Sequence, residues 1–427
     1  MNYIGIDLGT TAVKCGIYED GKELSIYRRE YQLIADGDRV EQDAELWWEI
    51  ICDGIKTLAN ETGIRDIEAL SVSSQGISIV PIAADGTCMS NAISWLDTRA
   101  GEETEYLKKN VGEDEIYRVT GKKTLSCYTL PKMMWLKKHC PDTVKNAALF
   151  LMPLDYINFK LCGAAVTDHS MASGTMMYDI DKRCWDKRFL ELAGVTEAQL
   201  PKVANMGTFI GNVLPEVAKE LGVSPDMKIV LGGQDQKLSA LGAGIGDGIA
   251  TLSVGTSSAI TFAMGGDEKP EFARFAFDDK DTVYEVPFET TGAALKWLKN
   301  IMNYESYADM DVDAEKAGCS KGISFNPNFS VGGAMDGIKL GVDRGNVVYG
   351  LYESIAREFA KCFSENDGVN EIRIFGGGAK SEIWCKVIGE ITGKKVAMLN
   401  TNETAALGAV MLASGGRVEP AKIVKYI

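Results

Sequence analysis

The carboxylate of Asp235 is the first candidate for chemistry in this sequence. It follows a predicted buried strand, Lys228–Leu231, and a predicted tight turn at Gly232-Gly233, and it precedes a small-residue helix. Glycines at a strand end let the backbone approach a ligand, and catalytic residues are common on such connections. The chain has 2 histidines, too few for a histidine-based triad or metal site to be expected. We therefore expect the general base to be a carboxylate, Asp235.

Two hydroxyl-rich breaks between apolar runs are candidates for binding phosphate. Gly255-Thr256-Ser257 separates two predicted strands, and Gly9-Thr10-Thr11 does the same near the start of the chain. Amide and hydroxyl donors in such a break suit a phosphate oxygen. The two strand–break–strand patterns also match each other, as a duplicated domain would. Because β-hairpins converge easily, duplication and coincidence stay about equally open.

Polar residues at other strand ends could bind a polyhydroxylated ligand. Gln75 follows the short buried strand Ala69–Ser73 and is predicted to point into a cleft, with a plain turn residue as the alternative. Asp97 and Arg99 come just after Trp95 and, in an extended segment, would face the same side. A carboxylate accepts hydrogen bonds from vicinal hydroxyls while a guanidinium donates to them. The alternative is an Asp–Arg pair that braces a loop.

Two further glycine-rich runs could suggest nucleotide sites. Gly376-Gly377-Gly378 lies between a predicted strand and a predicted helix, where a flat adenine or ribose could contact backbone, although a glycine triplet is a weak signal alone. Gly242–Gly246 follows a helix rather than a strand, so a dinucleotide fingerprint is rejected there. The phosphate-loop pattern Gly-x-x-x-x-Gly-Lys-Ser/Thr does not occur.

Composition sets broad limits on the class of protein. A length of 427 residues allows two domains of about 200 residues each. The net charge of −15 argues against nucleic acid or an anionic membrane as a partner. The 10 scattered cysteines form no Cys-x-x-Cys pair, so reduced thiols are expected. The chain opens directly into a strand and has no apolar run of membrane-spanning length, which favours a cytoplasmic enzyme.

The order of these motifs resembles that of the FGGY carbohydrate kinases, a family in the actin-like ATPase superfamily. The similarity extends from Tyr3 to about Ala413. The first motif alone is weak because heat-shock chaperone ATPases share it, whereas the motifs in register are specific. They are Ile6–Thr11, Gly232–Asp235, Gly255–Ser257, Gly376–Ser381 and Asn402–Ala409.

The resemblance implies an α/β fold with two ribonuclease H-like, actin-like ATPase domains and a cleft between them, closing to exclude water. Residues 1–243 would bind sugar and carry the catalytic aspartate, and residues 244–427 would bind nucleotide. The implied reaction transfers the γ-phosphate of MgATP to a hydroxyl of a small neutral sugar. A ketose such as a pentulose is placed ahead of a hexulose or polyol. The rival classes are a non-kinase actin-like or chaperone-like ATPase and a sugar-binding regulator that has lost catalysis.

The resemblance also assigns roles residue by residue. It assigns catalysis to Asp235 and the binding of magnesium, through water, to Asp7. Sugar binding is assigned to Gln75, Trp95, Asp97, Arg99 and Gln234. ATP binding is assigned to Gly9, Thr10, Thr11, Lys14, Gly255, Thr256, Gly292, Gly377, Gly378, Ala379 and Asn402. The sugar-binding set contains no cluster of basic residues, and a neutral sugar is expected for that reason.

Two segments depart from the family pattern. Gln75-Gly76-Ile77 has neither the Gln-Met-His typical of xylulose kinases nor the Gln-Arg-Glu typical of glycerol kinases, which leaves the sugar open. Phe325–Gly333 is a shortened form of a longer family region, and this leaves the rim of the cleft and any subunit contact open. A homodimer is the assembly considered.

Overall fold

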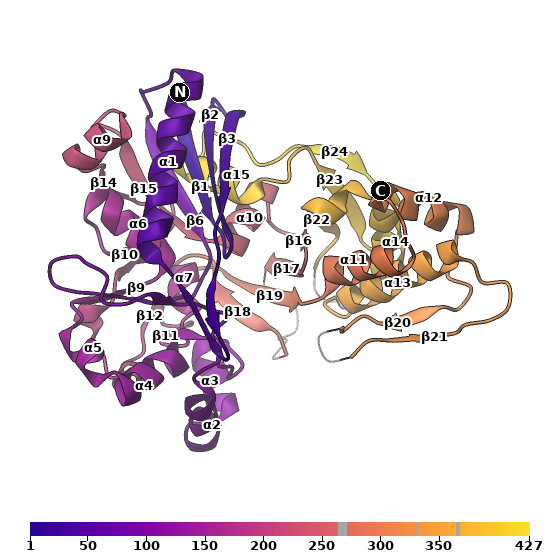
Figure 1. Ribbon diagram of the computed structural model, residues 1–427, viewed down its shortest axis with the longest axis horizontal. Coiled ribbons are helices and arrows are strands. Elements are labelled where there is room, and N and C mark those ends of the chain that lie inside the picture. The colour runs from indigo at the N-terminus through magenta and orange to yellow at the C-terminus, as the bar shows by residue number, and fades with distance from the viewer. Residues whose placement is uncertain (264–270, 330–331, 364–367) are drawn as a thin grey trace. The chain divides into compact units, whose positions relative to one another are not determined.

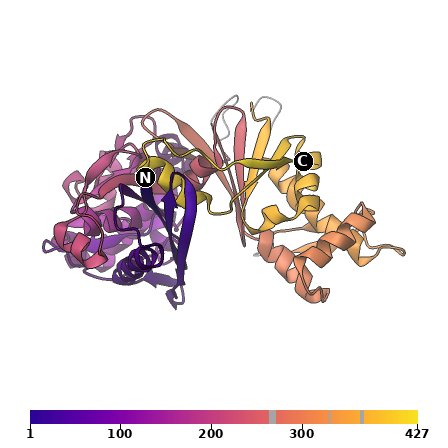
Figure 2. The ribbon, with the colours of Figure 1, turned by 90° about the horizontal axis from the view of Figure 1, so that it is seen from above.

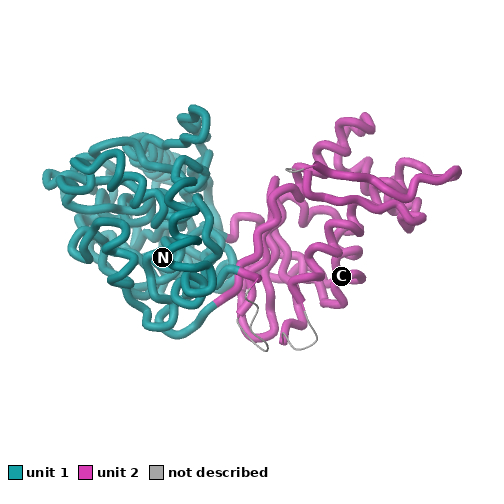
Figure 3. Tube along the Cα trace, turned by 90° about the horizontal axis from the view of Figure 1, so that it is seen from below, with its two compact units in different colours: residues 1–242, 273–282, 405–420 teal, residues 243–272, 283–404, 421–427 magenta. Residues whose placement is uncertain are grey.

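The computed structural model describes residues 1–263, 271–329, 332–363 and 368–427 (Figure 1). The chain forms two compact units. Unit 1 contains residues 1–242, 273–282 and 405–420, and unit 2 contains residues 243–272, 283–404 and 421–427 (Figure 3). The stretches 273–282 and 405–420 thus group with the N-terminal part of the chain. Residues 330–331 of the shortened segment lie outside the described residues.

Unit 1 is built on a mixed sheet. Its strands, in spatial order, are β14 (Phe209–Asn212), β15 (Lys228–Gln234), β6 (Ala69–Ser74), β1 (Asn2–Leu8), β2 (Ala12–Glu19) and β3 (Lys22–Glu30). β1, β6 and β15 run parallel, while β1, β2 and β3 form an antiparallel meander. The register pairs Leu8 with Ser74 and Ser74 with Gln234. The carboxyl ends of the three parallel strands therefore lie side by side.

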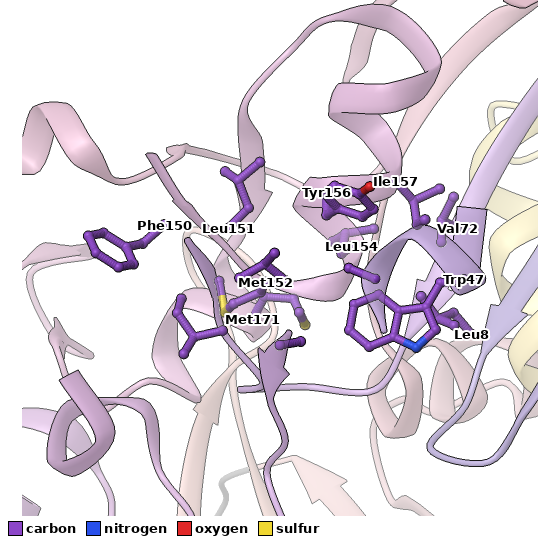
Figure 4. Packing of buried hydrophobic residues seen from close by; sticks show 14 of the residues in the cluster. Leu8, Trp47, Val72, Phe150, Leu151, Met152, Leu154, Tyr156, Ile157 and Met171 are labelled. Carbon is purple, nitrogen blue, oxygen red and sulfur yellow. The ribbon is translucent and has the colours of Figure 1, made fainter. Parts of the chain in front are cut away.

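Helix α1 (Ala44–Thr62) covers β2 and β3 (Figures 1 and 2). It begins where the Asp43 carboxylate accepts hydrogen bonds from the first-turn amides. Its buried face includes Trp47, which meets Tyr156 of α6 (Pro153–Cys162) edge to face at a centroid distance of 6.5 Å (Figure 4). Both rings belong to the large apolar core of unit 1.

Strand β15 continues through Gly232 and Gly233, so the predicted turn at these glycines is wrong. A side chain at Gly232 would overlap the carbonyl oxygen of Val72 in β6, and glycine alone allows this close approach. The β15–β6 register shifts just before Gly233, as in a β-bulge. Helix α10 (Asp235–Ala243) starts at Asp235 itself. Asp235 therefore stands directly at the junction of strand and helix.

Within unit 1, helix α15 (Thr404–Ala413) packs closely against β1 and α10 because small residues lie at these contacts. A side chain at Gly408 would overlap the carbonyl oxygen of Leu238 in α10. A side chain at Gly5 of β1 would overlap the carbonyl oxygen of Ala406. α15 thus holds both the first strand and the helix that Asp235 begins.

Gly408→Ala is expected to lower the free energy of unfolding by about 1–3 kcal/mol, because an added methyl group overpacks a backbone contact. Urea denaturation monitored by circular dichroism measures the loss. Gly101→Ala is the control, since an added methyl group at this first residue of α2 (Gly101–Asn110) meets no heavy atom within 4 Å. Equal stability of both variants would contradict the close contact between α15 and α10.

Unit 2 repeats the strand order of unit 1. Six of the seven strands in its sheet follow the order β19 (Thr282–Phe288), β17 (Ser258–Ala263), β16 (Ile249–Val254), β22 (Glu371–Phe375), β23 (Lys395–Leu399) and β24 (Ile423–Tyr426). β16, β17 and β19 form an antiparallel meander, and β22 and β23 join β16 in parallel. In unit 1 the meander β1–β2–β3 corresponds to β16–β17–β19, and the parallel strands β6 and β15 correspond to β22 and β23. The shared topology favours duplication over coincidence.

The remaining elements complete the two units. Unit 2 also contains α11 (Thr291–Ile301), α12 (Tyr307–Ala317), α13 (Arg344–Ala360), α14 (Glu382–Thr392), β20 (Ser324–Asn326), β21 (Ala334–Asp336) and a 3₁₀ helix, Gly377–Lys380. Unit 1 also contains the helices α3 (Glu113–Thr120), α4 (Thr129–His139), α5 (Pro141–Asn146), α7 (His169–Ser173), α8 (Lys187–Ala193), α9 (Pro215–Leu221) and a 3₁₀ helix, Glu197–Gln199. Its short strands are β4 (Ile34–Asp36), β5 (Arg39–Gln42), β7 (Val80–Ile82), β8 (Ala92–Ile93), β9 (Leu149–Leu151), β10 (Val166–Asp168), β11 (Tyr178–Asp179), β12 (Cys184–Trp185), β13 (Lys202–Ala204) and β18 (Ala273–Ala276). Within the described ranges, none of the helices has both the length and the hydropathy to cross a bilayer.

Candidate active site

The carboxyl ends of β1, β6 and β15 bring three predicted segments together in unit 1. Gly9, Gln75 and Asp235 each follow one of these strands, and the Gln75 amide donates to the carbonyl of Leu8 at 2.8 Å. The Asp235 Oδ1 atom accepts hydrogen bonds from Gln234 Nε2 at 2.6 Å and from the Gln236 amide at 2.7 Å. Asp235 is half-buried. A carboxylate at this position is placed to accept a proton from a bound ligand.

The hairpin of β1 and β2 carries the predicted magnesium and phosphate residues. Asp7 and Lys14 are cross-strand partners, with 4.0 Å between Asp7 Oδ2 and Lys14 Nζ. The turn is closed by a hydrogen bond of 2.9 Å from the Gly9 amide to the Ala12 carbonyl, and Thr11 is exposed in this turn. The hairpin therefore presents one carboxylate, one ammonium group and a hydroxyl within a short stretch.

The donor set around Asp7 fits a magnesium ion that a substrate also ligates. Magnesium keeps several waters and is usually held by one or two carboxylates together with phosphates. In the part of the chain that the structure describes, no three or more His, Cys, Asp or Glu side chains are grouped so as to hold a metal ion. Asp7 therefore suits the water-mediated role that the resemblance implies.

Gln75 is buried in a side-chain network that the sequence analysis missed. Gln42 Nε2 donates to Gln75 Oε1 at 3.4 Å and to the Thr10 carbonyl at 2.9 Å. Gln75 Nε2 lies 3.5 Å from the Tyr31 hydroxyl, which donates to the Gly9 carbonyl at 2.5 Å. The network links the end of β6 to the β1–β2 turn. No local pattern marks Gln42 or Tyr31, because their partners lie far away in sequence.

Trp95, a predicted sugar-binding residue, forms a hydrogen bond with Thr10, a predicted phosphate-binding residue. Its side chain is 36% exposed, and its Nε1 donates to Thr10 Oγ1 at 3.0 Å. The indole presents a partly open apolar face. Trp95 is therefore more accessible to a ligand than Gln75, whose side-chain amide is buried.

Asp97 and Arg99 form a buried ion pair with each other. Asp97 is 0% exposed, and its carboxylate accepts from the Val40 amide at 2.7 Å and from Arg99 Nε at 2.9 Å. The Arg99 side chain is 5% exposed and also bonds Glu41 at 2.7 Å. Burial lowers the pKa of Arg99, but the two carboxylates outweigh burial and raise it. The side chains of Asp97 and Arg99 therefore lie on the same side, as predicted, and an Asp97 amide–Ser94 carbonyl hydrogen bond of 3.1 Å closes the turn that precedes them. The pair braces the loop that carries Trp95.

Three lysines of unit 1, Lys122, Lys132 and Lys237, are fully buried. In α4, Lys132 Nζ donates to the Ser94 and Cys127 carbonyls, both at 2.6 Å, and burial lowers the pKa of Lys132 to about 7. Lys122 and Lys237 place their ammonium groups 3.4 and 3.3 Å from the centroid of the Phe275 ring. Lys122, Lys132 and Lys237 are not members of the predicted sugar-binding set, for which no cluster of basic residues is expected. These lysines come from separate segments of the chain.

The segment that departs from the family pattern holds a strained residue. Ile77 has a φ of 57°, in the left-handed region, which a β-branched residue rarely adopts. Thr129 Oγ1 donates to the Ile77 carbonyl at 3.0 Å. Such a conformation costs on the order of 1–3 kcal/mol and is characteristic of functional sites. The strain lies two residues after Gln75.

Unit 2 places Gly255 and Thr256 beside the start of α11. The turn after β16 is closed by the Gly255 amide donating to the Ser257 carbonyl at 2.9 Å. A side chain at Gly292 would overlap the Gly255 carbonyl oxygen, and the Ala293 amide donates to the Thr256 carbonyl at 2.9 Å. Gly292 is thus required by the close approach of two backbones. The helix start and the turn make one continuous backbone surface.

The glycine triplet lies next to that turn in unit 2. Gly376 has a φ of 95°, and its amide donates to Asn402 Oδ1 at 3.1 Å. Gly377 and Gly378 begin the 3₁₀ helix that Ala379 continues. The parallel register pairs Ser253 of β16 with the last residue of β22, so the motifs after both strands meet at one edge. The structure brings all predicted nucleotide residues of unit 2 to that edge.

Comparison with known proteins identifies the family. Residues 2–242 match the N-terminal domain of the FGGY family of carbohydrate kinases, and residues 250–415 match its C-terminal domain. The chain belongs to the FGGY family of carbohydrate kinases. It is a phosphotransferase that acts on a sugar hydroxyl, with ATP as the phosphate donor.

Relatives of this FGGY kinase cover nearly its whole length. It is 30% identical to a xylulose kinase of Bacillus subtilis (strain 168), over 97% of this chain and 88% of the relative. It is 26% identical to a gluconokinase of the same organism, over 96% and 86%. The structure of a ligand-bound xylulose kinase from Lactobacillus acidophilus superposes with a TM-score of 0.92, at 25% identity, covering 100% of this chain and 93% of that one. The two-domain actin-like ATPase fold is confirmed.

Proposed function

We propose that this kinase phosphorylates a small neutral ketose, with a pentulose ahead of a hexulose or a polyol. The observation that carries the proposal is the state of Arg99, which two carboxylates hold in a buried position. A neutralised guanidinium is a poor anchor for an anionic sugar. The open indole of Trp95 suits the apolar face of a sugar ring or chain. The xylulose kinases among the similar proteins support the same choice.

In this proposal Asp235 is the general base. It accepts the proton of the sugar hydroxyl that attacks the phosphoryl group. Gln75, Asp97 and Arg99 act on the sugar indirectly, because their hydrogen bonds are made within unit 1 and hold the surrounding loops. Trp95 makes the direct contact.

The remaining residues hold the nucleotide. ATP, when bound, supplies the phosphoryl group, and magnesium neutralises its charge. Asp7 would hold the magnesium ion, through water. We assign sugar binding to residues 1–243 and nucleotide binding to 244–427, with 273–282 and 405–420 supporting the former. The residues assigned to ATP are Gly9, Thr10, Thr11, Lys14, Gly255, Thr256, Gly292, Gly377, Gly378, Ala379 and Asn402.

A sugar acid is the second candidate substrate. It is favoured by one observation, the pair of ammonium groups that Lys122 and Lys237 place on Phe275. Lys237 follows Asp235 by two positions, and gluconokinase is among the similar proteins. Both lysines are fully buried, however, and Lys122 donates to the Arg274 carbonyl. The two ammonium groups already have partners within the protein, so a substrate carboxylate is the less favoured partner for them.

A substrate panel tests the proposal. ADP release is measured with D-xylulose, D-ribulose, D-fructose, glycerol and D-gluconate, with a sugar-free reaction as the control. We expect kcat/KM for a pentulose to exceed that for gluconate by about 10-fold or more, within the range that differing pocket contacts supply. A higher kcat/KM for gluconate would establish the second candidate. ADP release that no sugar accelerates would contradict both and support an ATPase of another class.

A further inference from the structure

We propose that Gln234 is a positioning residue that orients the carboxylate of Asp235, and that it is not a contact for the sugar. This inference rests on the proposed role of Asp235 as the general base. It replaces the role that family resemblance gave to Gln234. Three features of the structure carry it: the partners of the Gln234 side chain, the anchoring of its backbone and the space it occupies.

Both ends of the Gln234 side-chain amide bond to the first residues of α10. Its Nε2 donates to Asp235 Oδ1 at 2.6 Å, a short hydrogen bond to a carboxylate. Its Oε1 accepts from the Gln236 amide at 3.2 Å, and the same amide donates to Asp235 Oδ1 at 2.7 Å. Asp235 Oδ1 therefore accepts hydrogen bonds from two donors, the Gln234 side chain and the Gln236 amide. These two donors are also hydrogen-bonded to each other.

The Gln234 backbone is anchored to the buried first turn of α7. Its amide donates to Ser170 Oγ at 3.0 Å. Asp168, which is fully buried, caps α7 by accepting from the Ser170 amide at 2.8 Å and from the Met171 amide at 3.1 Å. Burial raises the pKa of Asp168 to about 6, while the bonds to Ser170 and the charge of Lys237 act to lower it. The position of Gln234 is thus fixed by a second, buried element.

The space for the Gln234 side chain is provided by Gly76. A side chain at Gly76 would bring its first carbon to 3.1 Å from Gln234 Cγ. Gly76, which is part of the segment that departs from the family pattern, therefore leaves room for the Gln234 side chain next to Asp235. The two residues come from the ends of β6 and β15, which the sheet register places next to each other.

These hydrogen bonds to Asp235 determine the orientation of its carboxylate plane. Rotation of an aspartate carboxyl group about its last torsion has a broad energy profile, so hydrogen bonds decide its orientation. With Oδ1 held by Gln234 and Gln236, the direction of Oδ2 is set as well. Proton transfer requires the base within hydrogen-bond reach of the hydroxyl in a defined geometry, and small misplacements are costly.

Gln234→Met tests the inference, since it keeps side-chain length but removes both hydrogen bonds. With the best sugar of the panel, we expect kcat to fall by about 10–100-fold while the KM values for sugar and MgATP change less than about 2-fold. Gln234→Glu, which keeps the acceptor for Gln236 but loses the donor to Asp235, should show the same fall. Gln32→Met on the surface is the control and should match the parent enzyme. A raised sugar KM with kcat retained would overturn the inference and identify Gln234 as a sugar contact.

The double variant separates this inference from the proposed base. If Asp235 is the base that Gln234 orients, Gln234→Met should cause no further loss in an Asp235→Asn background. An Asp235→Asn enzyme with near-parent turnover would overturn the proposed role of Asp235 as the base, on which this inference rests. An inactive Asp235→Asn enzyme, combined with unchanged kcat in Gln234→Met, would overturn only the positioning role.

Discussion

Asp235→Asn is expected to lower kcat for sugar phosphorylation by about 10²–10⁴-fold, the usual contribution of a general base. The substitution keeps the size of the side chain and an oxygen acceptor for the Gln236 amide, so the start of α10 should stay folded. Binding of MgATP, measured by calorimetry, should change less than about 2-fold because the phosphate and adenosine residues are untouched. The loss should therefore appear in kcat and not in either KM.

Asp226→Asn is the matched control for this variant. Asp226 is exposed on the turn before β15 and precedes Asp235 in the same strand–helix unit. Its replacement should leave kcat unchanged. Turnover of Asp235→Asn close to that of the parent enzyme would mean that another group accepts the proton.

Asp97→Ala is expected to lower the free energy of unfolding by about 3–5 kcal/mol, the usual cost of breaking a buried ion pair by removing one partner. The variant leaves the buried Arg99 guanidinium with Glu41 as its charged partner, and the Val40 amide loses its acceptor. Urea denaturation at neutral pH measures the loss. Because the pair braces the Trp95 loop, the KM for sugar should also rise while that for MgATP holds.

Glu105→Ala controls for the loss of an ion pair in general. Glu105 pairs with Lys108 on the exposed surface of α2, where such a pair contributes about 0–1 kcal/mol. A loss of less than about 1 kcal/mol in Asp97→Ala as well would show that the pair does not brace the loop. A raised sugar KM at parent stability would instead restore Asp97 as a direct sugar contact.

The position of the site could be predicted because strand ends are recognisable in the amino-acid sequence. Parallel strands end at one edge of a sheet, so the segments that begin at Gly9, Gln75 and Asp235 could be expected to meet. The family resemblance supplied the pairing of these segments and the expected kinase activity. Local pattern and the order of the family motifs were therefore enough to place the candidate base near the first hairpin.

The partners of these residues could not be predicted, because they come from distant segments. Gln75 is paired with Gln42 and Tyr31, and the chain between them gives no periodic signal. The two lysines on Phe275 are separated in the same way. The Gly232-Gly233 pair is typical of a turn but lies within a strand, because glycine serves equally where another strand approaches closely. Local composition does not distinguish these two uses.

The interleaving of the two units has a consequence for dissecting the protein. A fragment cut at Gly242 would keep the first family domain but lose residues 273–282 and 405–420 of unit 1, and with them β18 and α15. The surfaces around Gly5 and Leu238, which α15 covers, would then face water, and aggregation or partial unfolding is the expected fate of such a fragment. Supplying the missing helix in trans, as in fragment complementation, or fusing it by circular permutation would be needed to recover an independently folding half.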